Sequence, residues 1–152
     1  MTEKEEEFIH FTSCIKALNN AWVIITSIKE QTGNPLIGPA FRFALIEYSK
    51  PYRQSFGSKR WKLDTECIPD EMKDLHNRIT DARDQIHAHS DLTVMEARVY
   101  IHEVEGQRYS GIVQNKITGL EELPNIDKIQ FLIEETLNNM YEKERVLEAA
   151  LP

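Results

Sequence analysis

The hydrophobic positions of this chain follow a helical period in four segments, and the first of these is the longest. It extends from about Glu3 to Gln31, and Thr2 with Glu5 has the form of a capping box at its start. Gly33 and Pro35 then end it. Its apolar residues recur at alternating steps of three and four, as in the seam of a helix bundle: Phe8, Phe11, Ile15, Leu18, Trp22 and Ile25.

Two further helices are predicted in the middle of the chain. One starts near Pro39, and Pro51 is expected to bend or end it. Its apolar stripe comprises Phe41, Leu45, Tyr48, Tyr52 and Phe56. After a loop over residues 57–68, the next helix starts near Pro69 or Asp70. That helix has two faces: an apolar seam of Met72, Leu75, Ile79, Ala82 and Ile86, and a polar stripe of His76, Thr80, Arg83 and His87.

The period then changes from helix to strand. Apolar and polar residues alternate from Ala97 to His102, Glu105-Gly106-Gln107 can turn the chain, and Arg108 to Val113 can return as a second strand. A last helix is predicted from Pro124 or Asn125 to about Ala149, with the apolar stripe Ile126, Ile129, Ile133, Leu137 and Met140. We therefore expect an all-α fold: a four-helix up-and-down bundle in one domain (residues 1–152), with a β-hairpin at about 97–114 between helices three and four.

Composition indicates the size of the core and the cellular location to expect for this fold. The chain has 152 residues, of which 41% are hydrophobic, enough for one buried core. Its longest unbroken apolar run, Ala21 to Ile25, is too short to span a membrane, and the acidic stretch Met1 to Glu7 is unlike a signal peptide. Cys14 and Cys67 form no metal-type pair. We expect a cytoplasmic protein with no membrane partner.

The distribution of charge changes this picture. The net charge of −7 argues against strong non-specific binding of nucleic acid. Residues 48–63 nevertheless contain no acid, and their basic residues include Lys59, Arg60 and Lys62, which become candidate RNA-binding groups. Aromatic residues interleaved with cations suit single-stranded RNA. The alternative is that the aromatic rings face the core while the cations are solvated, and both interpretations remain open here.

Reactive groups are concentrated between Thr80 and Asp91, where the sequence is T-D-A-R-D-Q-I-H-A-H-S-D. Arg83 is followed directly by Asp84, and His89 stands six positions after the arginine. Arginine can grip a phosphate at two points, and histidine can exchange a proton near neutral pH. A phosphate clamp beside a proton shuttle is what cleavage of a phosphodiester needs.

This segment resembles the Arg-(four to six residues)-His signature of the HEPN domain family, in which a polar residue follows the arginine. Here that residue is Asp84, and the tail Ala88-His89-Ser90-Asp91 is similar to members from abortive-infection phage defence. The resemblance implies a small helical bundle that forms a homodimer. Many members are metal-independent RNases or toxins, and others are inactive binding or scaffold modules.

For this chain the resemblance implies an endoribonuclease without a cofactor, related to toxins or phage defence. His89 would deprotonate the ribose 2′-hydroxyl, Arg83 would stabilise the phosphorane, and Asp84 would orient Arg83. His87 is an auxiliary candidate outside the family's spacing. The expected partners are a second copy, RNA and a cognate antitoxin or other protein. The alternative function is an inactive HEPN-like module that binds a nucleotide, a nucleic acid or a protein.

Two other interpretations compete for the same residues. H-x-H-x-D over residues 87–91 resembles the start of the metallo-β-lactamase metal site, but Leu92 stands where that family has another histidine, and the preceding segment is predicted to be helical. In a purely structural interpretation, Arg83 pairs with Asp84 or Asp81, and His89 caps the helix. We therefore expect no metal site.

Overall fold

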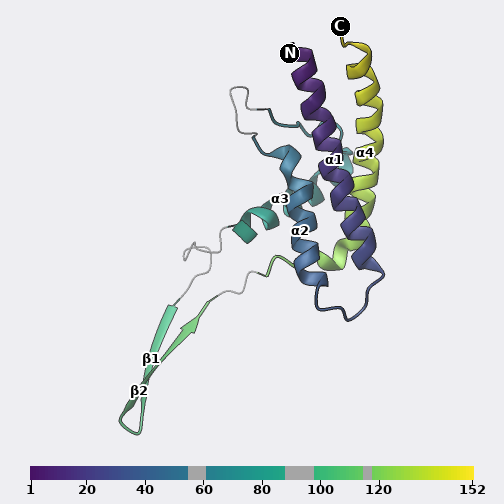
Figure 1. Cartoon of the computed structure of the whole chain (residues 1–152). Helices are drawn as coiled ribbons and strands as arrows, with labels where there is room; N and C mark the ends of the chain where they lie inside the picture. Colours follow the sequence, from purple (N-terminus) through teal and green to yellow (C-terminus); the bar gives the residue numbers. More distant parts are fainter. Residues whose placement is uncertain (55–60, 88–97, 115–117) are drawn as a thin grey trace.

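The computed structural model describes residues 1–54, 61–87, 98–114 and 118–152, with the side chains of residues 85–87 excepted. Four helices form the body of the molecule (Figure 1): α1 (Glu3–Lys29), α2 (Ile37–Ser49), α3 (Lys73–His87) and α4 (Ile126–Ala149). A two-stranded hairpin, β1 (Arg98–Val104) and β2 (Gln107–Val113), lies between α3 and α4 in the chain. The predicted fold class, a helical bundle with an inserted hairpin, is confirmed.

Helix α1 is the central element, because α2 packs on one side of it and α4 on another, while α3 packs on α2. Its first turn is stabilised by the predicted capping box: Glu5 N donates to Thr2 Oγ1 at 3.3 Å, and Thr2 N donates to Glu5 Oε2 at 2.5 Å. Its buried face repeats the stripe seen in the sequence: Phe11, Cys14, Ile15, Ala17, Leu18, Ala21 and Ile25. The N- and C-terminal ends lie near each other at one end of the bundle (Figure 1).

The end of α2 follows the prediction that Pro51 bends or ends this helix. The α-helix ends at Ser49 and continues as a short 3₁₀ helix, Lys50–Tyr52, because Pro51 has no N–H to extend the α-helical ladder. Tyr48 and Tyr52 both lie in the core, at 1% and 4% exposure. The backbone turns extended at Arg53.

Residues 61–69, which precede α3, form neither helix nor strand but are attached to the bundle by hydrogen bonds and by buried side chains. Leu63 N donates to Pro51 O at 2.8 Å, and Asn139 of α4 donates to Cys67 O at 2.9 Å. Leu63, Cys67 and Ile68 are buried against the bundle. The predicted loop is therefore a packed strap, and it holds the exposed residue Lys62 beside α3.

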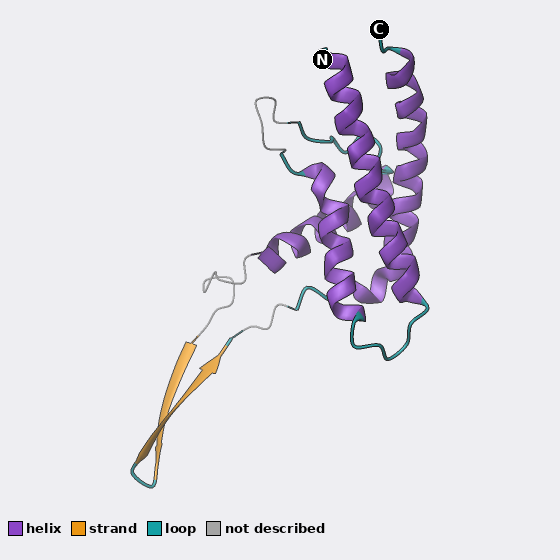
Figure 2. Ribbon diagram, in the orientation of Figure 1, coloured by secondary structure: helices purple, strands orange, loops and turns teal. Residues whose placement is uncertain are grey.

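The hairpin extends away from the helices (Figure 2). Every residue of β1 and all but Gly111 of β2 are exposed. Glu105 and Gly106 form the turn with φ angles of 49° and 78°, as a type I′ turn requires. Among the described residues, no helix is long and apolar enough to cross a membrane.

We predict that the hairpin contributes little to the stability of the helices. Replacing residues 98–113 by a short Gly/Ser linker should shift the thermal unfolding midpoint by less than about 2 °C, because these residues bury almost no surface. Circular dichroism at 222 nm would measure it. Leu18→Ala, at a fully buried position, is the control and should cost about 2–5 kcal/mol. A large loss on removing the hairpin would show that it packs against the helical body.

Candidate functional site

The structure brings together Arg83, Asp84 and a third residue, Arg53. Arg83 Nη1 donates to Asp84 Oδ1 at 3.0 Å. The other carboxylate oxygen, Oδ2, accepts from Arg53 Nη2. Asp84 thus bridges two guanidinium groups, one from α3 and one from the segment after α2. We call these three residues the arginine cluster, and two positive charges sharing one carboxylate leave a net charge of about +1 for an anion.

Arg53 is also attached to the backbone of α3. Its Nη2 donates to Thr80 O at 3.3 Å, one turn before Asp84. The side chains of the cluster are partly accessible, at 39% for Arg53, 25% for Arg83 and 47% for Asp84. Exposed ion pairs of this kind contribute little to stability. Their main effect is geometric, since they fix where two cations stand on the surface.

Beside this cluster, a buried group of polar rings joins α2 to α3. Tyr48 Oη lies 2.8 Å from His76 Nδ1, and both residues are almost fully buried. The Tyr52 ring meets the His76 ring edge-on, with 4.5 Å between centroids. His76 is therefore held by one hydrogen bond and by edge-on aromatic contacts with both tyrosines.

Burial lowers the pKa of His76 to about 4, and the positive charge of Arg53 acts in the same direction. Burial also raises the pKa of Tyr48 well above its usual value. Both groups are therefore neutral at pH 7. Because the phenol keeps its proton, we assign Tyr48 as the donor and His76 Nδ1 as the acceptor, which leaves the ring proton on Nε2.

A cavity of about 390 Å³ opens next to these groups. It is lined by Tyr52 and Arg53, by residues 62–65 of the strap, and by His76, Asn77 and Thr80 of α3. We call it the α3 cavity. The polar stripe predicted for this helix is thus divided: His76 and Thr80 are buried at the cavity, and Arg83 belongs to the cluster beside it.

Several predicted site residues lie outside the described part of the chain. His89, Lys59 and Arg60 are among them, as is the side chain of His87, whose backbone ends α3. Lys62 is described and lines the α3 cavity from its exposed position. Arg53 was present in the sequence as one cation of a basic segment, and the periodicity gave no signal that would pair it with Asp84.

The aromatic residues of the basic segment follow the core interpretation where the structure describes them. Tyr48 and Tyr52 are buried, and Trp61 is half-buried with its ring stacked on His10 at 5.9 Å between centroids. These rings are therefore not presented for stacking on the bases of a bound strand. The structural interpretation of Arg83 is also correct in one respect, since it pairs with Asp84.

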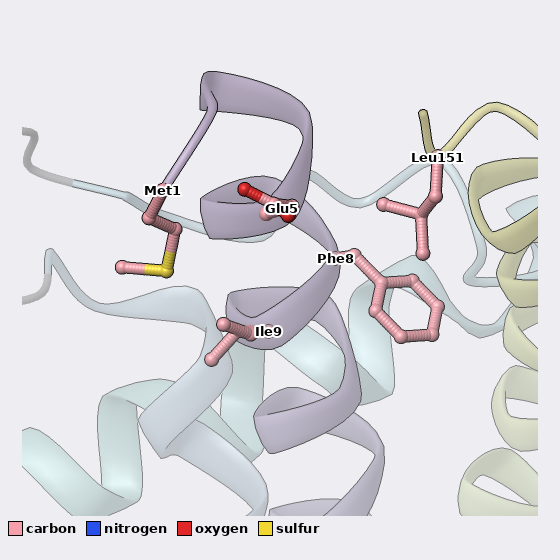
Figure 3. A pocket seen from close by; sticks show the side chains of 5 residues that line it. All are labelled: Met1, Glu5, Phe8, Ile9 and Leu151. Atoms are coloured by element: carbon pink, nitrogen blue, oxygen red, sulfur yellow. The ribbon is translucent and has the colours of Figure 1, made fainter.

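A second cavity, of about 410 Å³, lies at the end of the bundle near both termini (Figure 3). Its lining is mostly apolar, with Met1, Phe8, Ile9 and Leu151 around the carboxylate of Glu5. Its lining includes no arginine, lysine or histidine side chain, whereas that of the α3 cavity includes Arg53, Lys62 and His76. The α3 cavity is therefore the better candidate site.

No group of three or more metal-ligating side chains occurs in the ranges that the structure describes. The H-x-H-x-D segment lies almost wholly outside those ranges, so the metal interpretation stays a matter of sequence. No protein-family model, curated protein or solved structure matches this chain. The geometry of α3 and its neighbours therefore carries the functional argument.

The lowered pKa of His76 predicts that acid destabilises the protein before most carboxylates titrate. The unfolded chain has a histidine pKa near 6.5 and the folded protein one of about 4, so between these values the unfolded state alone takes up the proton. Stability should fall as pH falls from 7 to 5, by about 2 kcal/mol from this residue. Urea unfolding at both pH values measures it.

A His76→Gln variant is the control for this effect. It is expected to be less stable at pH 7, since it loses the Tyr48 contact, but its stability should change less between pH 7 and pH 5. If the free energy of unfolding of the variant changed between pH 7 and pH 5 as much as that of the wild type, His76 would not be the source of the pH dependence.

Proposed function

We propose that this protein is a HEPN-like endoribonuclease that cleaves RNA without a metal ion, with Arg83 and His89 as its reactive groups. The observation that carries the proposal is the arginine cluster. Asp84 holds the guanidinium groups of Arg53 and Arg83 together on the last turns of α3, directly before the segment that contains His89. Paired planar guanidinium groups can donate to the two non-bridging oxygens of a phosphodiester.

In the proposed reaction, His89 removes the proton from the ribose 2′-hydroxyl, and that oxygen attacks the adjacent phosphorus. Arg83 stabilises the charge that develops on the phosphorane oxygens. The bond to the 5′-oxygen of the next nucleotide breaks, and this oxygen takes up a proton as it leaves. The products are a 2′,3′-cyclic phosphate and a 5′-hydroxyl, and no metal is needed because the nucleophile belongs to the substrate.

The cluster gives Asp84 a definite role in this scheme. Its carboxylate accepts from Arg83 at 3.0 Å, so it fixes the orientation of the guanidinium that would face the substrate. Arg53 shares the same carboxylate and reduces its negative charge near the phosphate. The proposal therefore includes Arg53 as a positioning residue that acts through Asp84, which the sequence did not suggest.

The proposal also includes a cytoplasmic homodimer that acts as a toxin or in phage defence, with an antitoxin or another protein as a further partner. On a regular helix His89 would align with Ile86 rather than with Arg83, so two copies facing each other would complete the pair. The free thiols Cys14 and Cys67 suit a reducing compartment.

A second candidate function is a catalytically silent module that binds a nucleotide or RNA. The α3 cavity favours it, because Arg53, Lys62 and His76 line a pocket that does not require His89. The two functions differ in outcome: binding without cleavage identifies the silent module.

We predict that Arg83→Ala and His89→Ala each abolish cleavage of single-stranded RNA while the protein stays folded. Loss of the general base should lower the rate about a hundredfold or more. Arg83→Lys should recover little, because lysine lacks the two-pronged fork, and His87→Ala should be milder. Gel assays with 2′,3′-cyclic phosphate detection, repeated with a metal chelator, would measure this.

Arg78→Ala is the matched control for these variants. Arg78 lies on the same helix, is half-exposed and pairs with Glu122 away from the cluster. Its removal should leave cleavage unchanged. Activity that disappears with the chelator would favour metal catalysis, and the absence of cleavage and of toxicity on expression would favour the silent module.

We also predict that the cations of the 59–62 segment contribute to RNA affinity through phosphate contacts. The triple variant Lys59→Ala, Arg60→Ala, Lys62→Ala should bind single-stranded RNA more weakly, with a smaller dependence on salt. Each lost contact should reduce the slope of log affinity against log salt by about 0.7. Fluorescence anisotropy over a salt series measures this.

The control is a triple variant of equal charge at exposed positions elsewhere: Lys16→Ala, Lys128→Ala, Arg145→Ala. This variant should keep the wild-type slope. Equal slopes in the two triple variants would mean that the 59–62 segment does not contact RNA.

A further inference from the structure

The α3 cavity combines cations with aromatic and hydrogen-bonding side chains. The chain as a whole is acidic, with a net charge of −7, yet two cations line this cavity. Arg53 reaches it from the segment after α2, and Lys62 from the strap. Together they set a positive potential over a recess of about 390 Å³, which favours an anionic ligand.

Arg53 is held in place by hydrogen bonds from only one of its guanidinium nitrogens. Its Nη2 donates to Asp84 and to Thr80 O, while its Nη1 makes no hydrogen bond to another described residue. Lys62 is exposed and forms no ion pair with a described residue. Among the described residues, one guanidinium nitrogen of Arg53 and the ammonium group of Lys62 therefore have no partner, and both residues line the cavity. A fixed and a flexible cation together can grip a phosphate.

The acid in the lining does not cancel this charge at close range. Asp64 Oδ1 accepts from Glu66 N at 2.9 Å, and its Oδ2 lies 3.9 Å from Lys143 Nζ on the α4 side. The carboxylate is thus engaged by its own loop and by a cation from another helix. Its repulsion of an anion at Arg53 is correspondingly reduced.

The remaining lining suits a ring with hydrogen-bonding edges. Tyr52 and His76 line the cavity but are only 4% exposed each, so the contacts with a ring come from their polar neighbours. Asn77 is exposed on α3, and an amide can both donate and accept. Thr80 Oγ1 donates to the backbone of His76 and Asn77, so it can still accept a hydrogen bond. A phosphate alone would leave this half of the cavity unused.

We infer that the α3 cavity binds one nucleotide unit, with its phosphate at Arg53 and Lys62 and its base or ribose at the polar edge formed by Asn77 and Thr80. The volume is near the lower end of the range for ligand pockets, which suits one nucleotide and is too small for an oligonucleotide. The inference rests on the proposed function in its choice of nucleotide as ligand. It adds a subsite beside the arginine cluster, where a nucleotide next to the cleaved bond would sit.

Isothermal titration of the full chain with UMP and AMP tests this inference, with uridine and inorganic phosphate as partial ligands. At least one of the two nucleotides should bind, and more tightly than either partial ligand. Lys62→Ala should weaken nucleotide binding about tenfold or more, because a charged hydrogen bond is lost, and Asn77→Ala should weaken it less. Arg145→Ala, an exposed cation on α4, is the matched control and should bind as the wild type does. Unfolding midpoints establish that each variant is folded.

The outcomes separate this subsite from the proposed reaction. Arg83→Ala should lose cleavage and keep nucleotide binding. Competition of a trinucleotide with the bound mononucleotide would identify the ligand as part of an RNA strand, and its failure would identify a free nucleotide; both support the subsite. Nucleotide binding in a protein that cleaves no RNA would refute the ribonuclease while the subsite stands. Unchanged affinity in Lys62→Ala, inorganic phosphate binding as tightly as the nucleotides, or no binding of UMP or AMP would overturn the inference.

Discussion

The hydrogen bond between Tyr48 and His76 is the interaction on which the arrangement of α3 depends. Helix α3 offers few apolar side chains to the core, with Leu75, Ile79 and Ala82 as its buried apolar residues outside the last turn. A helix with so narrow an apolar face is anchored weakly by burial alone. The 2.8 Å contact adds a directional constraint, because an imidazole buried without its partner would be costly. It fixes the rotation of α3 about its axis, and with it the positions of Thr80, Arg83 and Asp84.

A second constraint comes from the chain between α2 and α3. Pro51 ends the regular ladder of α2, and its carbonyl then accepts from Leu63 across a twelve-residue separation in sequence. This hydrogen bond brings Leu63 next to Pro51, so Arg53 and Lys62 both line the α3 cavity. Two positive charges therefore come together here through backbone geometry, in a chain whose net charge is −7.

The elements of the fold were largely predictable, whereas the partners at the site were not. Stripes such as Leu18 to Ile25 and Ile129 to Leu137 follow from the helical period alone, and the alternation after Ala97 correctly predicted a hairpin. Arg83 with Asp84 was found because the two residues are adjacent in sequence. Arg53 contacts Asp84 from 31 positions away, and local periodicity carries no information about such a pair. Tyr48 and Tyr52 were ambiguous for a related reason, since the same four-residue step suits a core face and a stacking platform.

The reactivity of the two cysteines can report local opening of this bundle. Burial raises the pKa of Cys14 to about 11 and that of Cys67 above its usual value, so almost no thiolate is present at neutral pH while the chain is folded. Since the thiolate is the form that reacts with alkylating agents, modification has to wait for an opening of the structure. Cys14 lies on α1 and Cys67 on the strap. The rates at the two sulfur atoms would therefore time separate events, the opening of the central helix and the release of the segment that carries Lys62.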